Sequence, residues 1–531
     1  MNDILSHAVN RSRLCGLLVA LTGACFVILQ QVTELSAQDN LPPVIVSASR
    51  MPSSSIETVT SATVIGKTEI ESKQPVSVTE LLRSVPGLHI DQNGGRGGGA
   101  SVYMRGADPN FTLVMVDGIQ ANDPLNNHGG SFNFSDLDSA GIERIEVIRG
   151  PVASVYGSAA IGGVINIITK RGSAQPQASI DFTGGRFGYG RTAFTTSGRS
   201  GIFDYAFSTA YLSDGEPVKG SNFRNGSYNG KFSIAPSDNA LLQMTSHFAD
   251  SHSESFPEDS GGPQYAVRRQ TDRRHEQQTT VGLNFSHHPL AWLDYDLQTS
   301  FFNSIDDTKS PGVAAGVRDP LGIPPNSSNG SFQRGTFTAS TTLSAMDNLS
   351  VNLGFEEKIE HGSNDSELNF GRFILGGKFK LTRYTSSPFF ETRAAWPFGL
   401  TLQGGLRADF PSDFAAKVSP RVGAAFKIAA SGTTLKTNWG EGFHLPSFFA
   451  LGNPIVGNVN LKPETSKNFD AGAVQSLWDE HVEVGVTFFD NRYKNLIDFD
   501  AGPPPRLVNR SNVIARGVEA TLQIKPVDSL S

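Results

Sequence analysis

Most of the structural information in this chain is carried by one stretch, Ile142-Glu-Arg-Ile-Glu-Val-Ile-Arg-Gly-Pro-Val-Ala-Ser-Val-Tyr-Gly-Ser-Ala-Ala-Ile-Gly-Gly-Val-Ile-Asn-Ile-Ile-Thr169. Two short apolar runs typical of β-strands stand at its ends, and a segment of Gly, Pro and small residues separates them. This segment, from Arg149-Gly150-Pro151 to Gly162-Gly163, requires a tightly folded backbone and excludes bulky side chains. We therefore expect two strands packed around a compact corner.

Length and composition limit the class of protein. A chain of 531 residues is too long for one ordinary soluble core, so two domains or a large barrel are expected. Its net charge of −7 argues against a nucleic-acid partner, which needs a basic face. After residue 40 no apolar stretch approaches the roughly 18 residues of a spanning helix. With this composition a membrane protein must be a β-barrel, because only helices and closed barrels satisfy their backbone in lipid.

Residues 1–37 are predicted to be a secretory signal peptide. Two arginines precede an apolar run from Leu14 to Leu29, and cleavage is expected after Ala37. A membrane-anchor helix is the alternative, although glycine and threonine interrupt the run. The sequence Thr22-Gly23-Ala24-Cys25 weakly resembles a lipoprotein site but lacks the usual aliphatic residue three positions before the Cys. Both cysteines of the chain lie in this run, so the mature protein would have no thiol or disulfide chemistry.

Three further regions come after the signal peptide. Residues 38–55 are polar and are predicted to be a linker. Within it, Val44-Ile-Val-Ser-Ala-Ser-Arg50 is a short β-prone run of the kind that can add to the sheet edge of another protein through main-chain hydrogen bonds. Residues 56–173 form a compact mixed segment. A short helix is predicted within Ser77–Gly87, strands over Val102–Arg105 and Leu113–Val116, and a turn at Asp117-Gly118.

Residues 174–531 change to repeated alternating strands. In the runs Tyr205–Tyr211 and Val482–Phe488, large and small or apolar and polar residues alternate. This alternation, with turns and longer polar connections between the strands, is typical of a transmembrane barrel, although a soluble sandwich or propeller shares it. The polar stretches 250–276 and 306–332 are expected to be extracellular loops.

These features together resemble TonB-dependent outer-membrane receptors. The stretch Ile142–Thr169 is similar to the end of their plug domain, and three plug hallmarks precede it in family order. The hallmarks are Leu81-Leu-Arg-Ser-Val-Pro-Gly87, Met104-Arg-Gly106 and Val114-Met-Val-Asp-Gly118. Similar late-barrel landmarks are Trp439–Pro446, Asn460–Ser466, Phe469–Gly472 and Ala515–Glu519. The resemblance implies a mostly β protein with an N-terminal α+β plug domain (56–173) inside a large antiparallel transmembrane β-barrel (174–531). It also implies a monomer in the outer membrane of a Gram-negative cell.

The resemblance also assigns roles to residues in two places. The run at 44–50 matches the TonB box, which would bind TonB and its inner-membrane energising complex; its residues are Val44, Ile45, Val46, Ser47, Ala48, Ser49 and Arg50. In the family two plug arginines face two acidic residues of the barrel wall, and the matching positions are Arg105, Arg149, Asp470 and Glu519. Buried charges must be paired to be tolerated, so these four would latch the plug to the wall. Asp470 stands where the family commonly has Glu, and its side chain reaches less far.

Two glycine-rich plug loops are the expected substrate contacts, because glycine lets the backbone approach a ligand closely; the alternative is solvated loops without a ligand. The residues concerned are Gln92, Asn93, Gly94, Arg96, Asn122, Asp123, Asn126, Asn127 and His128. The run Gln92-Asn-Gly-Gly, followed by Ala100-Ser-Val-Tyr-Met-Arg-Gly106, is particularly similar to cobalamin receptors. A corrinoid is therefore the first substrate expected, a ferric siderophore the second, and haem, suggested by His128, the third.

No motif indicates catalysis or a bound cofactor. We find no nucleophile elbow, P-loop or zinc-spaced histidine pair, and His287-His288 before Pro289 is predicted to be a turn. The acidic run 250–259 offers hard oxygen ligands for a structural Ca²⁺, and its candidate ligands are Asp250, Glu254, Glu258 and Asp259. A solvated acidic loop without metal is the simpler alternative.

Two other classes of outer-membrane protein fit the sequence less well. A signalling receptor would need an extra periplasmic domain before the box, whereas only a few residues separate Ala37 from Val44. A passive porin or an adhesin would lack both plug and box. Family barrels have 22 strands, but residues 174–531 supply about 16–18, and Ser531 is not the aromatic terminal residue expected for insertion. Because an open sheet edge cannot face lipid, we expect that C-terminal strands are missing.

Overall fold

The computed structural model describes residues 44–45, 48–51, 53–54, 59–75, 77–92, 95–126, 129–257, 268–315, 322–478 and 481–524. The predicted signal peptide, 1–37, lies outside these residues. The chain divides into two compact units, Met1–Pro42 and Pro43–Ser531, and all of the described residues belong to the second unit. No helix in the described part of the chain is both long and apolar enough to cross a bilayer.

The stretch around residues 142–169 folds as two paired strands around a tight corner. Strand β8 (Ile142–Arg149) and strand β9 (Gly163–Thr169) pair antiparallel, and the short helix α4 (Ala153–Tyr156) lies in the corner between them. The side chains of Ile145, Val147 and Val164 are fully buried. Each such side chain contributes about 1.5–3 kcal/mol relative to exposure, so this pair of strands anchors the core of the small domain.

A five-stranded sheet forms around this pair. Its order is β3-β8-β9-β6-β7, with β3 at Ser61–Ile65, β6 at Thr112–Val116 and β7 at Ile119–Gln120. Strands β6 and β9 run parallel. Asp117 and Gly118, both with positive φ, form the predicted tight turn between β6 and β7. The predicted helix is present as α3 (Val78–Leu82). The domain also contains helix α2 (Lys67–Lys73), the strand pair β1 (Val44–Ile45) with β2 (Ser53–Ser54), the strand pair β4 (Leu88–Gln92) with β5 (Ala100–Met104), and short 3-10 helices.

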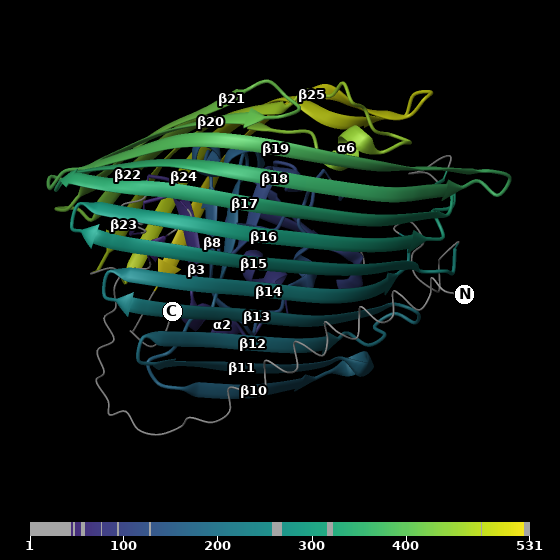
Figure 1. Ribbon diagram of the computed structural model, residues 1–531, viewed down its shortest axis with the longest axis horizontal. Helices are drawn as coiled ribbons and strands as arrows, with labels where there is room; N and C mark the ends of the chain where they lie inside the picture. Colours follow the sequence, from purple (N-terminus) through teal and green to yellow (C-terminus); the bar gives the residue numbers. More distant parts are fainter. Residues whose placement is uncertain are drawn as a thin grey trace. The chain divides into compact units, whose positions relative to one another are not determined.

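The rest of the unit is one antiparallel sheet of sixteen strands, in chain order from β10 to β25 (Figure 1). Within the described residues β10 and β25 do not pair with each other. The number agrees with the about 16–18 strands expected from length. The strands are β10 Gln177–Gly184, β11 Gly190–Ser200, β12 Phe203–Ser213, β13 Asn222–Ser237, β14 Ala240–Ser255, β15 Asp272–Leu290, β16 Leu293–Ser310, β17 Asn326–Met346, β18 Leu349–Asn369, β19 Ile374–Ala395, β20 Leu400–Pro411, β21 Lys417–Ile428, β22 Thr433–His444, β23 Glu464–Leu477, β24 Val482–Asp500 and β25 Arg506–Ile524.

Side chains alternate along these strands, but the buried side chains are polar and the exposed ones apolar, the reverse of a soluble protein. On β18, Glu356 and Glu360 are buried, whereas Leu353, Phe355 and Ile359 are between 40% and 51% exposed. Polar groups therefore point inward and apolar groups outward, which is the arrangement of a barrel wall facing lipid. This excludes the sandwich and propeller alternatives, whose apolar face would be the inner one.

Two sequence predictions in this region were wrong. The stretches 250–276 and 306–332 are loops only in part, since β14 continues to Ser255, β15 begins at Asp272, β16 continues to Ser310 and β17 begins at Asn326. Main-chain pairing does not require apolar side chains, so the strands extend beyond the apolar band. His287 and His288 lie in β15 and not in a turn, because Pro289 is accommodated where the register of β15 and β16 shifts.

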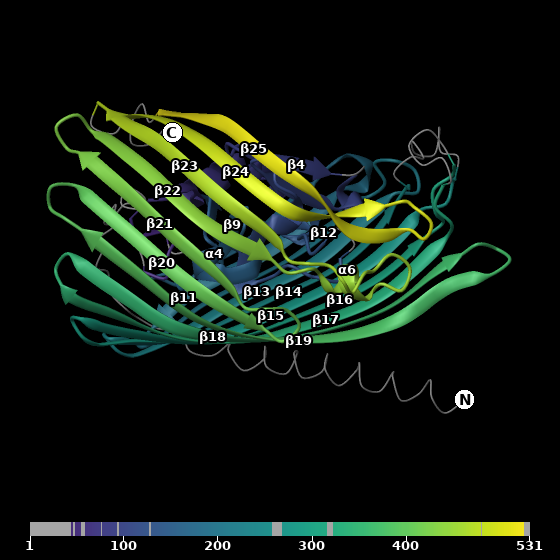
Figure 2. The same cartoon turned by 90° about the horizontal axis from the view of Figure 1, so that it is seen from above.

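The small domain lies inside the curve of the large sheet, and Figure 2 shows β9 and α4 within it. Helix α4 contacts β20, β21 and β22. Ion pairs join the two parts: Lys231 Nζ lies 2.7 Å from Asp117 Oδ1, and Arg191 Nη2 lies 2.6 Å from Asp138 Oδ1. Ion pairs and buried apolar contacts, such as that of Phe111 with Tyr493, therefore both hold the plug against the wall.

Gly163, the first residue of β9, allows the close packing of the corner between β8 and β9 to be tested. A Cβ at this position would overlap Met104 Sδ and the Ile148 carbonyl oxygen. We expect Gly163→Ala to destabilise the plug by about 1–3 kcal/mol, the usual cost of overpacking. Thermal unfolding and limited proteolysis of the plug measure this. The matched control is Gly335→Ala, where a Cβ in strand β17 meets nothing within 4 Å; equal behaviour of the two variants would contradict the proposed packing.

Candidate functional site: the plug latch, the coupling segment and a polar pocket

Arg105 forms a deeply buried charged contact between plug and wall. It follows β5 with a positive φ of 51°, and its N–H donates to the Gly87 carbonyl oxygen at 2.7 Å. Its guanidinium is fully buried and donates from Nε and Nη2 to Glu519 Oε1 and Oε2, both at 2.9 Å. The guanidinium also lies over the Phe489 ring, 4.8 Å from its centroid. A buried bidentate pair of this kind is among the strongest side-chain contacts.

Arg149, at the end of β8, adds a second positive charge. Its Nη1 lies 3.6 Å from Glu519 Oε2 and donates to the Pro86 carbonyl oxygen at 2.6 Å, and its Nη2 donates to Thr63 Oγ1 at 2.9 Å. Burial lowers the pKa of the Arg149 guanidinium, and the Glu519 carboxylate opposes this shift. Glu519 therefore compensates two plug arginines at once.

Asp470 lies beside this cluster without a direct ion pair. Within the described residues it forms no salt bridge closer than 4.0 Å, although the charges of Arg105 and Arg149 act on it. A Cβ added to Gly150 would lie 2.8 Å from Asp470 Oδ2, so the glycine at the corner permits this approach. The structure thus brings together Arg105, Arg149 and Glu519, and places Asp470 at their edge.

The predicted coupling segment, 44–50, is held by the wall at its C-terminal end. Val44 and Ile45 pair with Ser54 and Ser53, whereas Val46 and Ser47 lie outside the described residues. Ala48 and Ser49 are buried. The Ala48 carbonyl oxygen accepts from Arg421 Nη1 at 2.9 Å, and the Arg50 N–H donates to Glu391 Oε2 at 2.9 Å. Main-chain groups that another strand would need are therefore occupied by barrel side chains.

Glu356 connects the coupling segment with the interior of the barrel. Its Oε2 accepts from Arg50 Nη2 at 3.2 Å, and its Oε1 accepts from Arg407 Nη2 at 2.8 Å. Lys358 Nζ, two residues along β18, lies 3.7 Å from the same Oε1. One carboxylate therefore contacts three cations, of which Arg407 is also paired with Asp409 at 2.8 Å. The Gly157 corner of the plug also approaches Arg407, since a Cβ there would lie 2.9 Å from Arg407 Nε.

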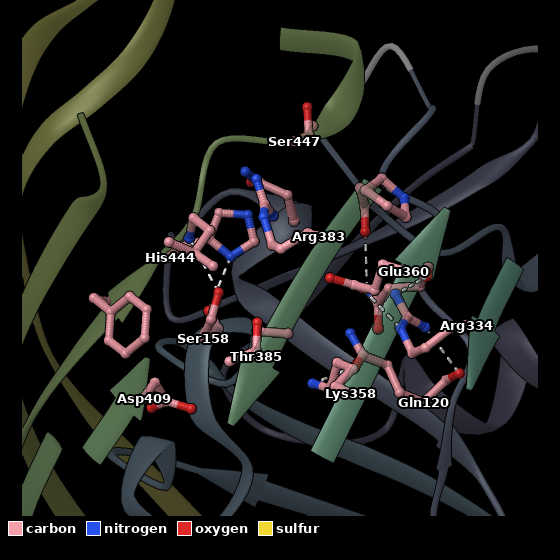
Figure 3. Close-up of a pocket in the computed structure, with 18 residues that line it drawn as sticks. Gln120, Ser158, Arg334, Lys358, Glu360, Arg383, Thr385, Asp409, His444 and Ser447 are labelled. Atoms are coloured by element: carbon pink, nitrogen blue, oxygen red, sulfur yellow. Dashed lines mark hydrogen bonds and ion pairs between the residues drawn. The ribbon is translucent and has the colours of Figure 1, made fainter. Parts of the chain in front are cut away.

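A small polar pocket of about 60 Å³ lies where plug loops meet the wall (Figure 3). Arg334 Nε donates to Glu360 Oε1 at 2.9 Å, and Arg334 Nη1 donates to the Gln120 carbonyl oxygen at 3.2 Å. Lys358 Nζ donates to Gln120 Oε1 at 3.4 Å. On the opposite side His444 Nδ1 is 3.0 Å from the Ser158 carbonyl oxygen. Plug residues of the lining are Asn110, Gln120, Asn122, Pro124, Gly129, Gly130, Ser158 and Ala159.

The predicted substrate residues divide into three groups. Asn93, Gly94, Asn127 and His128 lie outside the described residues. Gln92 ends β4, and Arg96 lies away from the pocket, with Nε 3.5 Å from Asp214 Oδ1. Asn122 does line the pocket, but its side-chain amide donates to the Thr112 and Gly130 carbonyl oxygens and accepts the Val114 N–H, so it shapes the loop.

Two further loop residues have structural contacts. Asp123 Oδ1 accepts the Leu125 N–H at 2.8 Å, and burial raises the pKa of Asp123 to about 6. The Asn126 carbonyl oxygen accepts the Gly129 N–H at 3.2 Å. Both contacts fix the backbone of the plug loop that borders the pocket.

Sequence reasoning missed the basic side chains that the wall contributes to the pocket: Arg334 on β17, Lys358 on β18 and Arg383 on β19. The one available signal was the charge pattern on β18, where Glu356, Lys358 and Glu360 alternate with Phe355, Glu357 and Ile359. Each of the three basic side chains is paired with a carboxylate of the wall, so the pocket offers charged donors and acceptors together.

The candidate calcium ligands are only partly described. Asp250 and Glu254 lie on the outward face of β14, and Glu258 and Asp259 lie outside the described residues. Glu254 Oε1 is 3.3 Å from Arg273 Nε and is therefore already paired. The calcium site remains a prediction.

A mixed domain lying within a large antiparallel sheet, with polar side chains inward and apolar ones outward, is the architecture of a plugged β-barrel of the outer membrane. Two family models match nearly the whole chain: the TonB-dependent receptor plug domain over residues 54–164, and the TonB-dependent receptor-like β-barrel over residues 170–530. The chain belongs to the TonB-dependent receptor family. It is a receptor and not an enzyme, in agreement with the sequence prediction.

The chain is similar to curated vitamin B12 transporters named BtuB. It is 26% identical to that of Vibrio cholerae serotype O1 over 525 residues, which cover 95% of this chain and 79% of that protein. It is 27% identical to that of Vibrio vulnificus over 505 residues, covering 93% and 77%. Among solved structures, the siderophore receptor PirA from Acinetobacter baumannii aligns with a TM-score of 0.70 at 20% identity, covering 88% of this chain and 78% of that one. The ferripyoverdine receptor of Pseudomonas aeruginosa aligns with a TM-score of 0.75 at 16% identity, covering 91% and 71%. These two likenesses show the fold alone.

Replacing the shared carboxylate tests the latch. Glu519→Gln keeps the shape but leaves two buried arginines without their countercharge, which typically costs about 3–5 kcal/mol. We expect lower thermal stability and faster proteolysis of the plug in the purified receptor.

The matched control is Glu441→Gln on β22. Glu441 pairs with Lys467 at 2.6 Å on the outer surface, where both side chains are partly exposed. Surface pairs contribute about 0–1 kcal/mol, so little change is expected. If Glu519→Gln behaved like this control, the latch would not hold the plug.

Proposed function

We propose that this receptor actively transports a corrinoid of the vitamin B12 type across the outer membrane, energised by TonB acting on residues 44–50. The observation that carries the substrate assignment is the similarity to the vitamin B12 transporters of two Vibrio species, which extends over more than nine-tenths of the chain. The similarity includes the plug, where sequence reasoning had already indicated a corrinoid.

The polar pocket is the proposed point of substrate contact. It combines donors from Arg334, Lys358 and Arg383 with the plug amides of Asn110 and Gln120. A corrinoid carries many amide side groups, which require both donors and acceptors at fixed positions. Such buried polar groups discriminate strongly, because a ligand that fails to match leaves them unpaired. The pocket therefore supports recognition by hydrogen bonding.

Coupling to TonB is proposed to pass through Glu356. This carboxylate contacts Lys358 at the pocket and Arg50 at the end of the coupling segment. A ligand donor that bound the Glu356 carboxylate beside Lys358 would compete with Arg50 and weaken its contact with Glu356. Released main-chain groups at residues 44–50 would then be free to pair as a strand with TonB. A pull on this segment would act next on the plug.

A ferric siderophore is the second candidate. The observation that favours it is that the three basic residues of the pocket lining outnumber its two acidic residues, Glu360 and Asp409, and an excess of cations suits an anionic iron chelate.

Binding assays with the receptor purified in detergent test the assignment. We expect cyanocobalamin to bind in preference to a panel of ferric siderophores. Lys358→Gln removes one charged contact, worth about 1.5–3 kcal/mol, and should weaken binding roughly 10- to 150-fold. The control Lys378→Gln lies on β19 with its Nζ 2.7 Å from Asp365 and is exposed, so no change is expected.

Uptake of labelled cyanocobalamin into cells separates transport from binding. Uptake should require TonB, whereas binding should not. Preferential binding of a siderophore would overturn the corrinoid assignment and leave the transporter intact. Uptake that persists without TonB would overturn the energised mechanism.

A further inference from the structure

Three potential metal ligands converge on the outer surface of the barrel, away from the plug and the pocket. Asp250 and His252 lie two residues apart on β14 and therefore point to the same face. His275 on β15 stands directly opposite His252 in the strand register. One donor atom from each residue lies within 4.8 Å of the other two.

The donor atoms already point at one another. His275 Nε2 lies 3.1 Å and His252 Nδ1 lies 3.2 Å from the same atom, Asp250 Oδ1. In a tetrahedral site with metal–ligand bonds of about 2.0–2.2 Å, neighbouring ligand atoms are separated by about 3.4 Å. The observed nitrogen–oxygen separations are close to this value, so small side-chain movements are sufficient to admit an ion.

The surroundings hold the three groups in place. Gln277 Nε2 donates to Asp250 Oδ2 at 2.8 Å, which leaves Oδ1 directed at the two imidazoles. The imidazole rings stack with centroids 4.0 Å apart and an interplanar angle of 21°. Ladder hydrogen bonds between β14 and β15 fix the backbone on both sides. Ligating carboxylates in metal sites are commonly oriented by such a second hydrogen bond.

The position of the cluster allows an ion to enter from water. The last large apolar side chain before it on the outward face of β14 is Phe248, and Asp250 and His252 are the next two residues on that face. The three side chains line an open cavity of about 770 Å³ and are between 31% and 59% exposed. Of the cations that line the same cavity, Arg273 is paired with Glu254 and Arg274 with Asp306, whereas Arg224 stands opposite His252 in the strand register.

We propose that Asp250, His252 and His275 form a binding site for a divalent transition metal of the Zn²⁺ type, which joins β14 to β15 near the connection between them. Two imidazoles and one carboxylate suit such an ion, whereas Ca²⁺ takes six to eight oxygen ligands. Three protein ligands leave a coordination position for water or another donor. The site is independent of the substrate proposed above.

Zn²⁺ titration of the tag-free, chelator-treated receptor by calorimetry tests the site. We expect one saturable equivalent, lost or weakened at least 10-fold in His252→Ala and in His275→Ala. Gln277→Ala should keep the stoichiometry and weaken affinity about 10- to 100-fold, as removal of an orienting partner does. The control His288→Ala removes an equally exposed histidine whose Nδ1 lies 2.6 Å from Asp294 Oδ1, and it should bind like the parent.

Folding of each variant is checked by thermal unfolding without metal, which should be unchanged because the three groups are on the surface. In the parent, Zn²⁺ should raise the unfolding temperature, and in the double variant His252→Ala/His275→Ala it should not. Equal Zn²⁺ binding by the parent and the double variant would overturn the proposal. Binding of Ca²⁺ in preference to Zn²⁺ at this site would overturn it as well.

Discussion

The rest of the structure depends on the burial of the charges of Arg105 and Arg149 between plug and wall. A charge removed from water must be compensated, and the only full ion-pair partner of both within the described residues is Glu519. The plug therefore cannot sit in the barrel in any orientation that separates these groups. The contact is buried and bidentate, yet it consists of only a few directional bonds, which suits the proposal that a pull on residues 44–50 breaks it.

Glycine residues of the plug leave the space that the contact between the plug arginines and Glu519 needs. Gly87, with a positive φ, lies where any side chain would overlap the Glu519 carboxylate. Gly150 and Gly157 bring the corner of the plug close to Asp470 and Arg407 in the same way. The small residues between β8 and β9 thus have two roles: they close a tight turn, and they leave room for charged side chains of the wall. The motif is both a folding element and part of the latch.

Local patterns in the sequence were sufficient to predict many of the strands and much of the plug. Neighbouring residues in the sequence determine the apolar strands around the corner, the helix after Ser77 and the turn at Asp117-Gly118. The structure contains all three features. Outward apolar and inward polar positions also follow from simple alternation. The lengths of the strands were underestimated, because backbone pairing continues through polar residues where side-chain patterns no longer indicate a strand.

Contacts between residues far apart in the sequence could not be predicted from local patterns. Arg50 and Glu356 are 306 positions apart, and Lys231 and Asp117 are 114 apart. Which charges meet depends on the register of sixteen strands around the plug, and a shift by one residue would turn every side chain to the other face. The pocket was missed for this reason, as were the two histidines of the proposed metal site, which meet only through the pairing of β14 with β15. The latch was identified only through resemblance to a family.

Single-molecule pulling on residues 44–50 of the receptor in a bilayer tests the central claim most directly. The force that extracts the plug is compared for the parent, Arg105→Met, Glu519→Met and the double variant. Because both substitutions break the same buried contact, each should lower the force, and the double variant should lose much less than the sum of the two losses. Additive losses, or a force unchanged in either single variant, would contradict the account.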